Sequence, residues 1–144
     1  LVDEVVYCTS DGSKGLKGKI EHGINYALEI YGPFDKCHFI GCNIMMRNAS
    51  ETTKSQGEIP TLVNLNTIMI DGTGMCGGCR LTLEKDGERI TKFACVDGPT
   101  FNGHIVDWDH LINRGERFDM REKEVFQTHT CKALEAERRR NQDK

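Results

Sequence analysis

The stretch Ile70-Asp71-Gly72-Thr73-Gly74-Met75-Cys76-Gly77-Gly78-Cys79 carries the most information in this chain of 144 residues. Together with the later Cys95 it gives the spacing D-x4-C-x2-C-x15-C. Four glycines separate the acid and the cysteines, and glycine lets a backbone turn sharply and approach a bound group closely. The stretch therefore predicts a loop that wraps around a metal centre, with Asp71, Cys76, Cys79 and Cys95 as its ligands.

The spacing of these four residues indicates the kind of centre. Plant-type 2Fe-2S ferredoxins use C-x4-C-x2-C followed by a distant fourth cysteine. The same spacing is present here, with Asp71 in the first position. A glycine-rich backbone can also donate N–H hydrogen bonds to the sulfides of such a cluster. Redox chemistry, and electron transfer above all, is the leading hypothesis.

Three other interpretations of the same residues stay open at this point. Gly72, Gly74 and Gly77 spell G-x-G-x-x-G, which binds dinucleotides when it lies between a strand and a helix. Residues 79–90 instead alternate between polar and apolar and break at Asp86-Gly87, which predicts a β-hairpin. Three thiolates and a carboxylate could hold zinc as a non-catalytic interaction module. The cysteines could also be structural, or form a redox C-x-x-C pair.

Composition excludes several classes of function. A net charge of −3 gives no indication of a nucleic-acid surface. No apolar run approaches the roughly 20 residues that a membrane helix needs, and the acidic N-terminus does not resemble a secretory signal. Seven cysteines, an odd number, do not fit a secreted disulfide scaffold and favour a reducing cytoplasm.

The order of predicted elements indicates an α/β fold. Apolar runs predict buried strands at residues 4–9, 36–42 and 61–65. Apolar residues at helical spacing from Leu16 to Tyr31 predict one amphipathic helix, which stops at Gly32-Pro33. A second helix is predicted at residues 43–55, with Asn43 as its N-cap. This alternation predicts a parallel sheet.

The second half of the chain reads differently. After the hairpin, the sequence predicts a strand that holds Cys95 and ends at Pro99. One short helix is predicted after Gly103, and the charged residues 119–144 predict a solvated helix.

The ends of the first two predicted strands are candidate binding positions, because ligands of open parallel sheets bind beyond the carboxyl ends of strands. Thr9 and Asp11 follow the first strand and offer a hydroxyl and an acid that suit a ribose. Gly41 and Cys42 follow the second strand, before a helix whose N-terminal dipole favours phosphate or amide oxygens. An ordinary loop and an ordinary helix start explain these residues as well. No nucleophile or general acid–base pair is evident in the sequence.

Residues 9–15, 40–46, 60–66 and 70–99 together resemble the ferredoxin–NADP reductase superfamily. The branch is that of dihydroorotate dehydrogenase electron-transfer subunits, sulfide dehydrogenase small subunits and the small subunit of NADH-dependent ferredoxin–NADP oxidoreductase. The resemblance covers about residues 1–118. It implies a 2Fe-2S cluster held by Asp71 and three cysteines, as in the sulfide dehydrogenase type. The dihydroorotate dehydrogenase type has cysteine where Asp71 stands.

The resemblance also implies a domain organisation. Residues 1–66 would be the C-terminal part of an NAD(P)-binding domain, half of a Rossmann-like parallel sheet. Residues 67–118 would be a small β-rich 2Fe-2S cluster lobe, and residues 119–144 a charged helical tail. Family members carry a FAD-binding β-barrel before these parts. The chain is therefore expected to begin partway through the nucleotide domain and, alone, neither to hold FAD nor to oxidise NAD(P)H.

For the nucleotide site, the resemblance implies that Asp11 lies near the adenosine ribose and that Met45 and Met46 lie behind the nicotinamide turn. Thr9, Gly41 and Cys42 complete the cofactor-binding candidates. In the parent protein, hydride would pass between NAD(P)H and FAD. Single electrons would pass through the cluster to or from a larger flavin/iron-sulfur subunit of a hetero-oligomer.

Overall fold

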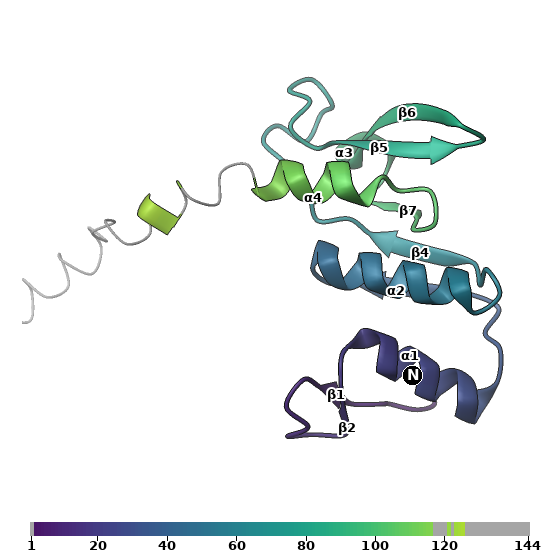
Figure 1. The fold of residues 1–144 in the computed structure, drawn as a ribbon. Coiled ribbons are helices and arrows are strands. Elements are labelled where there is room, and N and C mark those ends of the chain that lie inside the picture. The colour runs from purple at the N-terminus through teal and green to yellow at the C-terminus, as the bar shows by residue number, and fades with distance from the viewer. Residues whose placement is uncertain (1, 117–120, 122, 126–144) are drawn as a thin grey trace, which may run out of the picture. The chain divides into compact units, whose positions relative to one another are not determined.

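The computed structural model describes residues 2–116, 121 and 123–125. The chain divides into one compact unit of residues 1–113 and a second of residues 114–144. The elements, labelled in Figure 1, are β1 (Cys8–Thr9), β2 (Leu16–Lys17), α1 (Ile20–Tyr31), β3 (Cys37–Ile40), α2 (Asn43–Ser55), β4 (Thr61–Asn64), β5 (Arg80–Lys85), β6 (Glu88–Phe93), α3 (Ala94–Asp97), β7 (Thr100–Asn102) and α4 (Trp108–Glu116).

A β3–α2–β4 unit forms the centre of the first half. β3 and β4 pair in parallel, from Cys37 opposite Thr61 to Ile40 opposite Asn64. α2 packs on both strands and on α1, and its Met46 and Ala49 are completely buried. The second predicted helix and the strand at residues 61–65 are confirmed. The first predicted helix begins only at Ile20, since Leu16 lies in β2.

Two details of this half were predicted wrongly. Cys42, not Asn43, occupies the N-cap position of α2, and the Asn43 side chain instead donates to the carbonyl oxygen of Asn66. β3 is only half-buried, since Ile40 is 68% exposed. The apolar run predicted a buried strand, but one face of β3 is open to solvent, so the run alone overestimated its burial.

The sheet also differs from the predicted three parallel strands. β1 is two residues long and pairs in parallel with β2, with Cys8 opposite Leu16, so the prediction that residues 4–9 join β3 and β4 is wrong. The chain returns on itself here, because Leu16 N–H donates to Tyr7 O and Gly18 N–H donates to Thr9 O. The third strand of the β3–β4 sheet is β7, which runs antiparallel to β4.

The predicted hairpin is confirmed as the antiparallel pair β5–β6. Its two-residue turn has positive φ at Asp86 (54°) and Gly87 (81°), the geometry that suits the twist of a tight hairpin. Leu81 and Leu83 of β5 are buried, and on the free edge of β5 Asp107 N–H donates to Thr82 O.

Cys95 lies on the short helix α3 and not on a strand, so that prediction was wrong. One core cluster links the hairpin, α3 and α4 to α2 and the β3–β4–β7 sheet; it comprises Met46, Val63, Leu65, Cys79, Leu81, Leu83, Ala94, Phe101, Val106, Trp108 and Leu111. The predicted boundary between residues 66 and 67 stays a prediction.

Of the predicted tail at residues 119–144, all but 121 and 123–125 lies outside the described residues. Within the part of the chain that the structure describes, no helix has the length and apolar character needed to cross a membrane.

Candidate metal centre and neighbouring cavity

Two of the four candidate ligands meet in the structure. Cys79 directly precedes β5 and is 2% exposed, whereas Cys95 on α3 is half-buried. Their sulfur atoms are 3.2 Å apart, and Ala94 N–H donates to the carbonyl oxygen of Cys79. The two thiols therefore meet although they are sixteen residues apart in the sequence. One precedes the strand β5 and the other lies on the one-turn helix α3.

The pKa values of these two neighbouring thiols shift in opposite directions. The backbone N–H of Cys95 is the main cause that lowers the pKa of the Cys79 thiol. The hydrogen bond with Cys79 is the main cause that raises the pKa of the Cys95 thiol. Two like charges at this distance oppose each other, so the first proton leaves more easily than the second. The pair is suited to share one positively charged atom, as thiolate ligands do.

Asp71 and Cys76 occupy the glycine-rich loop that precedes Cys79. The Asp71 carboxylate accepts the N–H of Thr73 and the N–H of Cys76, both at 2.8 Å. The Thr73 N–H is the main cause that holds the pKa of this carboxyl below its usual value. Cys76 is exposed, and its sulfur accepts the N–H of Gly78 at 3.3 Å. The carboxylate thus serves its own loop in this structure.

The loop has the backbone that a tight wrap requires. Gly72, Gly74 and Gly77 have φ of +76°, +84° and +65°, in the left-handed region that side chains with a Cβ rarely adopt. A Cβ at Gly74 would lie 2.8 Å from a methyl group of Val96 on α3. Glycine at that position therefore lets the loop lie directly against the helix that holds Cys95.

The chemistry of the four candidate ligands fits an iron-sulfur cluster, but only two of the four have the geometry of ligands to a common metal. Three thiols and one carboxylate are ligand types that iron accepts. Among residues 2–116, 121 and 123–125, no three His, Cys, Asp or Glu side chains converge closely enough to hold a metal ion. The structure brings Cys79 and Cys95 together and does not bring Asp71 and Cys76 to them.

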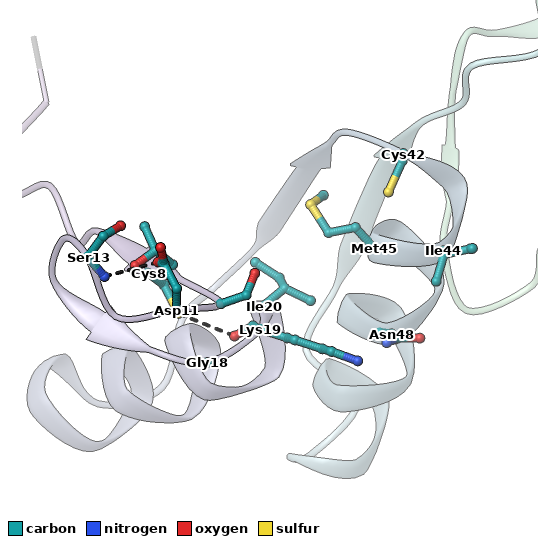
Figure 2. Close-up of a pocket in the computed structure, with 12 residues that line it drawn as sticks. Cys8, Asp11, Ser13, Gly18, Lys19, Ile20, Cys42, Ile44, Met45 and Asn48 are labelled. Atoms are coloured by element: carbon teal, nitrogen blue, oxygen red, sulfur yellow. Dashed lines mark hydrogen bonds between the residues drawn. The ribbon is translucent and has the colours of Figure 1, made fainter.

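A cavity of about 870 Å³ lies at the first half of the chain. Four predicted cofactor-binding residues line it: Thr9 at the end of β1, Asp11 in the following loop, and Cys42 and Met45 at the start of α2. Figure 2 shows Asp11 and Ser13 on the loop side and Cys42 and Met45 on the helix side. The Asp11 carboxylate accepts the N–H of Ser13 at 3.0 Å, which is the main cause that lowers its pKa. The volume is within the range of small-molecule sites.

Not every predicted residue reaches this cavity. Gly41 is not among its lining residues, and Met46 is completely buried in the core. Sequence reasoning missed other lining residues, namely Cys8, Gly18, Lys19, Ile20, Ile44 and Asn48. Four of them lie at the beginning of a helix: Lys19 and Ile20 start α1, and Ile44 and Asn48 lie about one turn apart in the first half of α2. The helix starts were visible in the sequence, but their convergence was not.

Comparisons with known proteins find similarity over the segment that contains the four candidate ligands. Residues 66–107 match the family described as the iron-sulfur cluster binding domain of dihydroorotate dehydrogenase B. This match includes Asp71, Cys76, Cys79 and Cys95, and it extends through β7 to the residue before α4.

Longer relatives carry the similarity over most of the chain. The dihydroorotate dehydrogenase B (NAD(+)) electron transfer subunit homolog of Thermotoga maritima is 39% identical over 136 residues, which are 94% of this chain and 46% of the relative. A Clostridium beijerinckii protein, described as an uncharacterized protein in the adh 3′ region, is 48% identical over 107 residues, 74% of this chain and 34% of that protein. The chain thus spans less than half the length of these relatives.

A solved structure agrees in fold. A chain from the structure of an NADH-dependent reduced ferredoxin–NADP oxidoreductase, described for flavin-based electron bifurcation, aligns with a TM-score of 0.72 and 39% identity. The alignment covers 85% of this chain and 42% of that chain. The comparisons confirm the resemblance found in the sequence: this mixed α/β chain is related to the electron-transfer subunits of this superfamily.

Proposed function

We propose that this chain is an electron-transfer part of an NAD(P)H-dependent flavin and iron-sulfur oxidoreductase, with a 2Fe-2S cluster on Asp71, Cys76, Cys79 and Cys95. The observation that carries the proposal is the 3.2 Å approach of the Cys79 and Cys95 sulfur atoms. These two residues lie inside the matched iron-sulfur family segment, residues 66–107. Their meeting from separate elements supports a metal shared by both thiols rather than two unrelated cysteines.

The proposal assigns different tasks to the two halves of the donor set. Cys79 and Cys95 are held by the core and form the fixed half of the site. Asp71 and Cys76 lie on a loop with three left-handed glycines, so the loop can turn its carboxylate and thiol towards the fixed pair. The bound cluster would supply one-electron transfer. Asp71, whose pKa is lowered, is ready as an anionic oxygen ligand without first losing a proton.

For the first half we propose part of a Rossmann-like nucleotide domain. The parallel β3–α2–β4 unit supports it, as does the cavity at the starts of α1 and α2. In this cavity Asp11 and Thr9 would bind ribose hydroxyls, and the N-terminal end of α2 at Cys42 would bind an anionic or amide group of NAD(P). Gly41, Met45 and Met46 would shape the turn beside it. Residues 1–66, 67–118 and 119–144 would be the three parts of this arrangement.

The remaining components are inferred from the relatives. Dihydroorotate dehydrogenase B electron transfer subunit homologs and the NADH-dependent ferredoxin–NADP oxidoreductase are the named relatives. We infer FAD in the full-length parent and a larger flavin/iron-sulfur subunit as partner. The cytoplasm is the proposed compartment, because Cys8, Cys37, Cys42, Cys76, Cys79 and Cys95 are free thiols in the structure.

The proposal is tested by anaerobic purification and reconstitution with iron and sulfide, followed by iron, sulfide and zinc analysis and visible absorption. The expected result is a coloured protein with about two irons and two sulfides per chain. Cys37→Ala is the control, since this half-buried thiol of β3 belongs to no candidate site; it should load as the wild type does. A colourless chain that takes up zinc in preference to iron would reject the proposal.

A further inference from the structure

Cys95 is the candidate ligand whose position needs the most explanation. The other three lie within residues 71–79, whereas Cys95 comes sixteen residues after Cys79. It lies on α3, which has only four residues, Ala94–Asp97. A helix of one turn is not stable by itself, because nucleation costs more than its few hydrogen bonds return. Contacts outside the helix must therefore hold α3 and the Cys95 sulfur in place.

Two such contacts join α3 to the cysteine loop. Ala94 is completely buried, and its N–H donates to the carbonyl oxygen of Cys79 at 3.2 Å. Val96 lies against Gly74, where a Cβ would meet its methyl group at 2.8 Å. These contacts fix the side of α3 that faces the loop.

The other side of α3 depends on Asp97. One oxygen of its carboxylate accepts the backbone N–H of Phe93 at 2.8 Å, and the other accepts the Lys92 ammonium group at 2.9 Å. Phe93 is the N-cap residue of α3 and makes no side-chain cap hydrogen bond. Asp97, the last residue of the helix, thus reaches back to the backbone N–H of the N-cap residue, Phe93. It closes residues 92–97 into a ring with Cys95 inside.

We propose that Asp97 is a positioning residue for Cys95, and that its carboxylate holds the Cys95 sulfur beside the Cys79 sulfur through the backbone of α3. Asp97 does not touch the metal. The proposal deepens the proposed function, because a misplaced fourth ligand weakens any cluster bound there. It also applies to the metal-free chain, in which the two sulfurs already approach to 3.2 Å.

Asp107 provides a matched control. Like Asp97, its carboxylate joins a backbone N–H, that of His110, to a basic side chain of β6, Arg89. It directly precedes α4 and accepts an N–H of the first turn of that helix, and it is not one of the candidate metal ligands. Removal of either carboxylate therefore costs a comparable set of contacts, but only one set encloses Cys95.

The first test uses the metal-free chain and the rate at which Cys79 and Cys95 form a disulfide. Diamide is the oxidant: it accepts two electrons and two protons from the two thiols and becomes the hydrazine, and peptide mass spectrometry identifies the new bond. Asp97→Ala should slow this reaction at least about threefold, because the two sulfurs spend less time within bonding reach. Asp97→Asn keeps an acceptor for Phe93 N–H and should recover part of the rate. Asp107→Ala should react like the wild type.

The second test uses the reconstituted chain and the rate at which a chelator removes its iron. Asp97→Ala should lose iron about tenfold faster than Asp107→Ala, the size of effect seen when groups that orient metal ligands are removed. The reduced-cluster electron paramagnetic resonance signal should also shift in Asp97→Ala and stay unchanged in Asp107→Ala. Circular dichroism of all variants identifies any that do not fold. If Asp97→Ala is one of them, the comparison of Asp97→Asn with Asp107→Ala decides the role of Asp97.

The outcomes separate the two proposals. If the wild-type chain takes up no cluster, the proposed function fails, and the thiol reaction still decides the role of Asp97. If Asp97→Ala forms the disulfide as fast as the wild type, the positioning role is overturned and the proposed function is untouched. Equal slowing in Asp97→Ala and Asp107→Ala would also overturn it, since the effect would then be general loss of stability.

Discussion

The two halves of the candidate donor set have opposite surroundings. Cys79 and Cys95 belong to, or pack against, the core cluster that includes Leu81 and Ala94. Asp71 and Cys76 lie on an exposed loop whose Met75 is 88% exposed. The first pair is in contact and the second is not directed to it. Side chains on packed elements are placed by the fold, whereas those on a glycine-rich loop need a ligand or partner to place them.

The largest expected effects come from removing one cysteine from each half of the donor set and measuring both the free energy of unfolding and the bound iron. Cys79→Ala removes a buried core sulfur and should lower the free energy of unfolding of the metal-free chain by roughly 1–2 kcal/mol. Cys76→Ala removes an exposed sulfur and should change it by less than about 0.5 kcal/mol. Urea unfolding measures both. The two variants should nevertheless lose bound iron alike, by about tenfold or more after reconstitution.

Either of two results would break the comparison. Equal destabilisation by the two substitutions would mean that Cys79 is no better anchored than Cys76. Full iron content in Cys76→Ala, with loss only in Cys79→Ala, would remove Cys76 from the ligand set.

A smaller effect is expected from Asp71→Cys. This change supplies a thiolate in place of the carboxylate, in a loop whose backbone already curves around that position. The cluster should still assemble, but its midpoint potential should shift, because ligand type is one of the factors that set the potential of an iron-sulfur cluster. Redox titration followed by visible absorption gives the value. An unchanged potential would show that Asp71 does not ligate iron and that its hydrogen bonds to Thr73 and Cys76 are its whole role.

The smallest expected effect is a pH dependence of stability that arises from His104, which follows β7 of the β3–β4–β7 sheet. His104, after β7, lies 3.2 Å from the Thr53 hydroxyl of α2. Burial is the main cause that lowers the pKa of His104; nearby Lys54 lowers it further and Glu58 opposes them. The folded state therefore takes up a proton less readily than the unfolded chain. The contribution of neutral His104 to stability is complete above the ordinary histidine pKa of about 6.5. It is lost as pH falls through the lowered pKa of the folded state.

We expect the free energy of unfolding to decrease as pH falls from 7 to 5.5, measured by urea titration. His104→Gln keeps a hydrogen-bonding group without this titration and should flatten the change. The same slope in wild type and His104→Gln would assign the pH dependence to other groups. Asp11, Asp71 and Asp97 do not interfere in this range, because their pKa values are lowered from an already acidic ordinary value.

Local sequence patterns predicted those elements whose periodicity is long enough to measure. The helix α2 is one example, because its buried Met46 and Ala49 are three residues apart, close to one helical turn; the hairpin with its Asp86-Gly87 turn is another. β7 was missed because three residues, Thr100–Asn102, carry no period. The strand predicted around Cys95 is the one-turn helix α3, whose contacts with Cys79 and whose Asp97–Phe93 hydrogen bond no local pattern could indicate.

The sequence by itself determined the chemistry of the candidate site: which thiols and which acid are available, at what spacing, and with glycines where the backbone must turn left-handed. Only the tertiary structure decided that Cys79 and Cys95 meet while Asp71 bonds to its own loop. It also decided that β1 pairs with β2, and that β7 completes the β3–β4 sheet. Ligand type and backbone freedom are properties of single residues, whereas pairing and approach depend on which distant segments share the core.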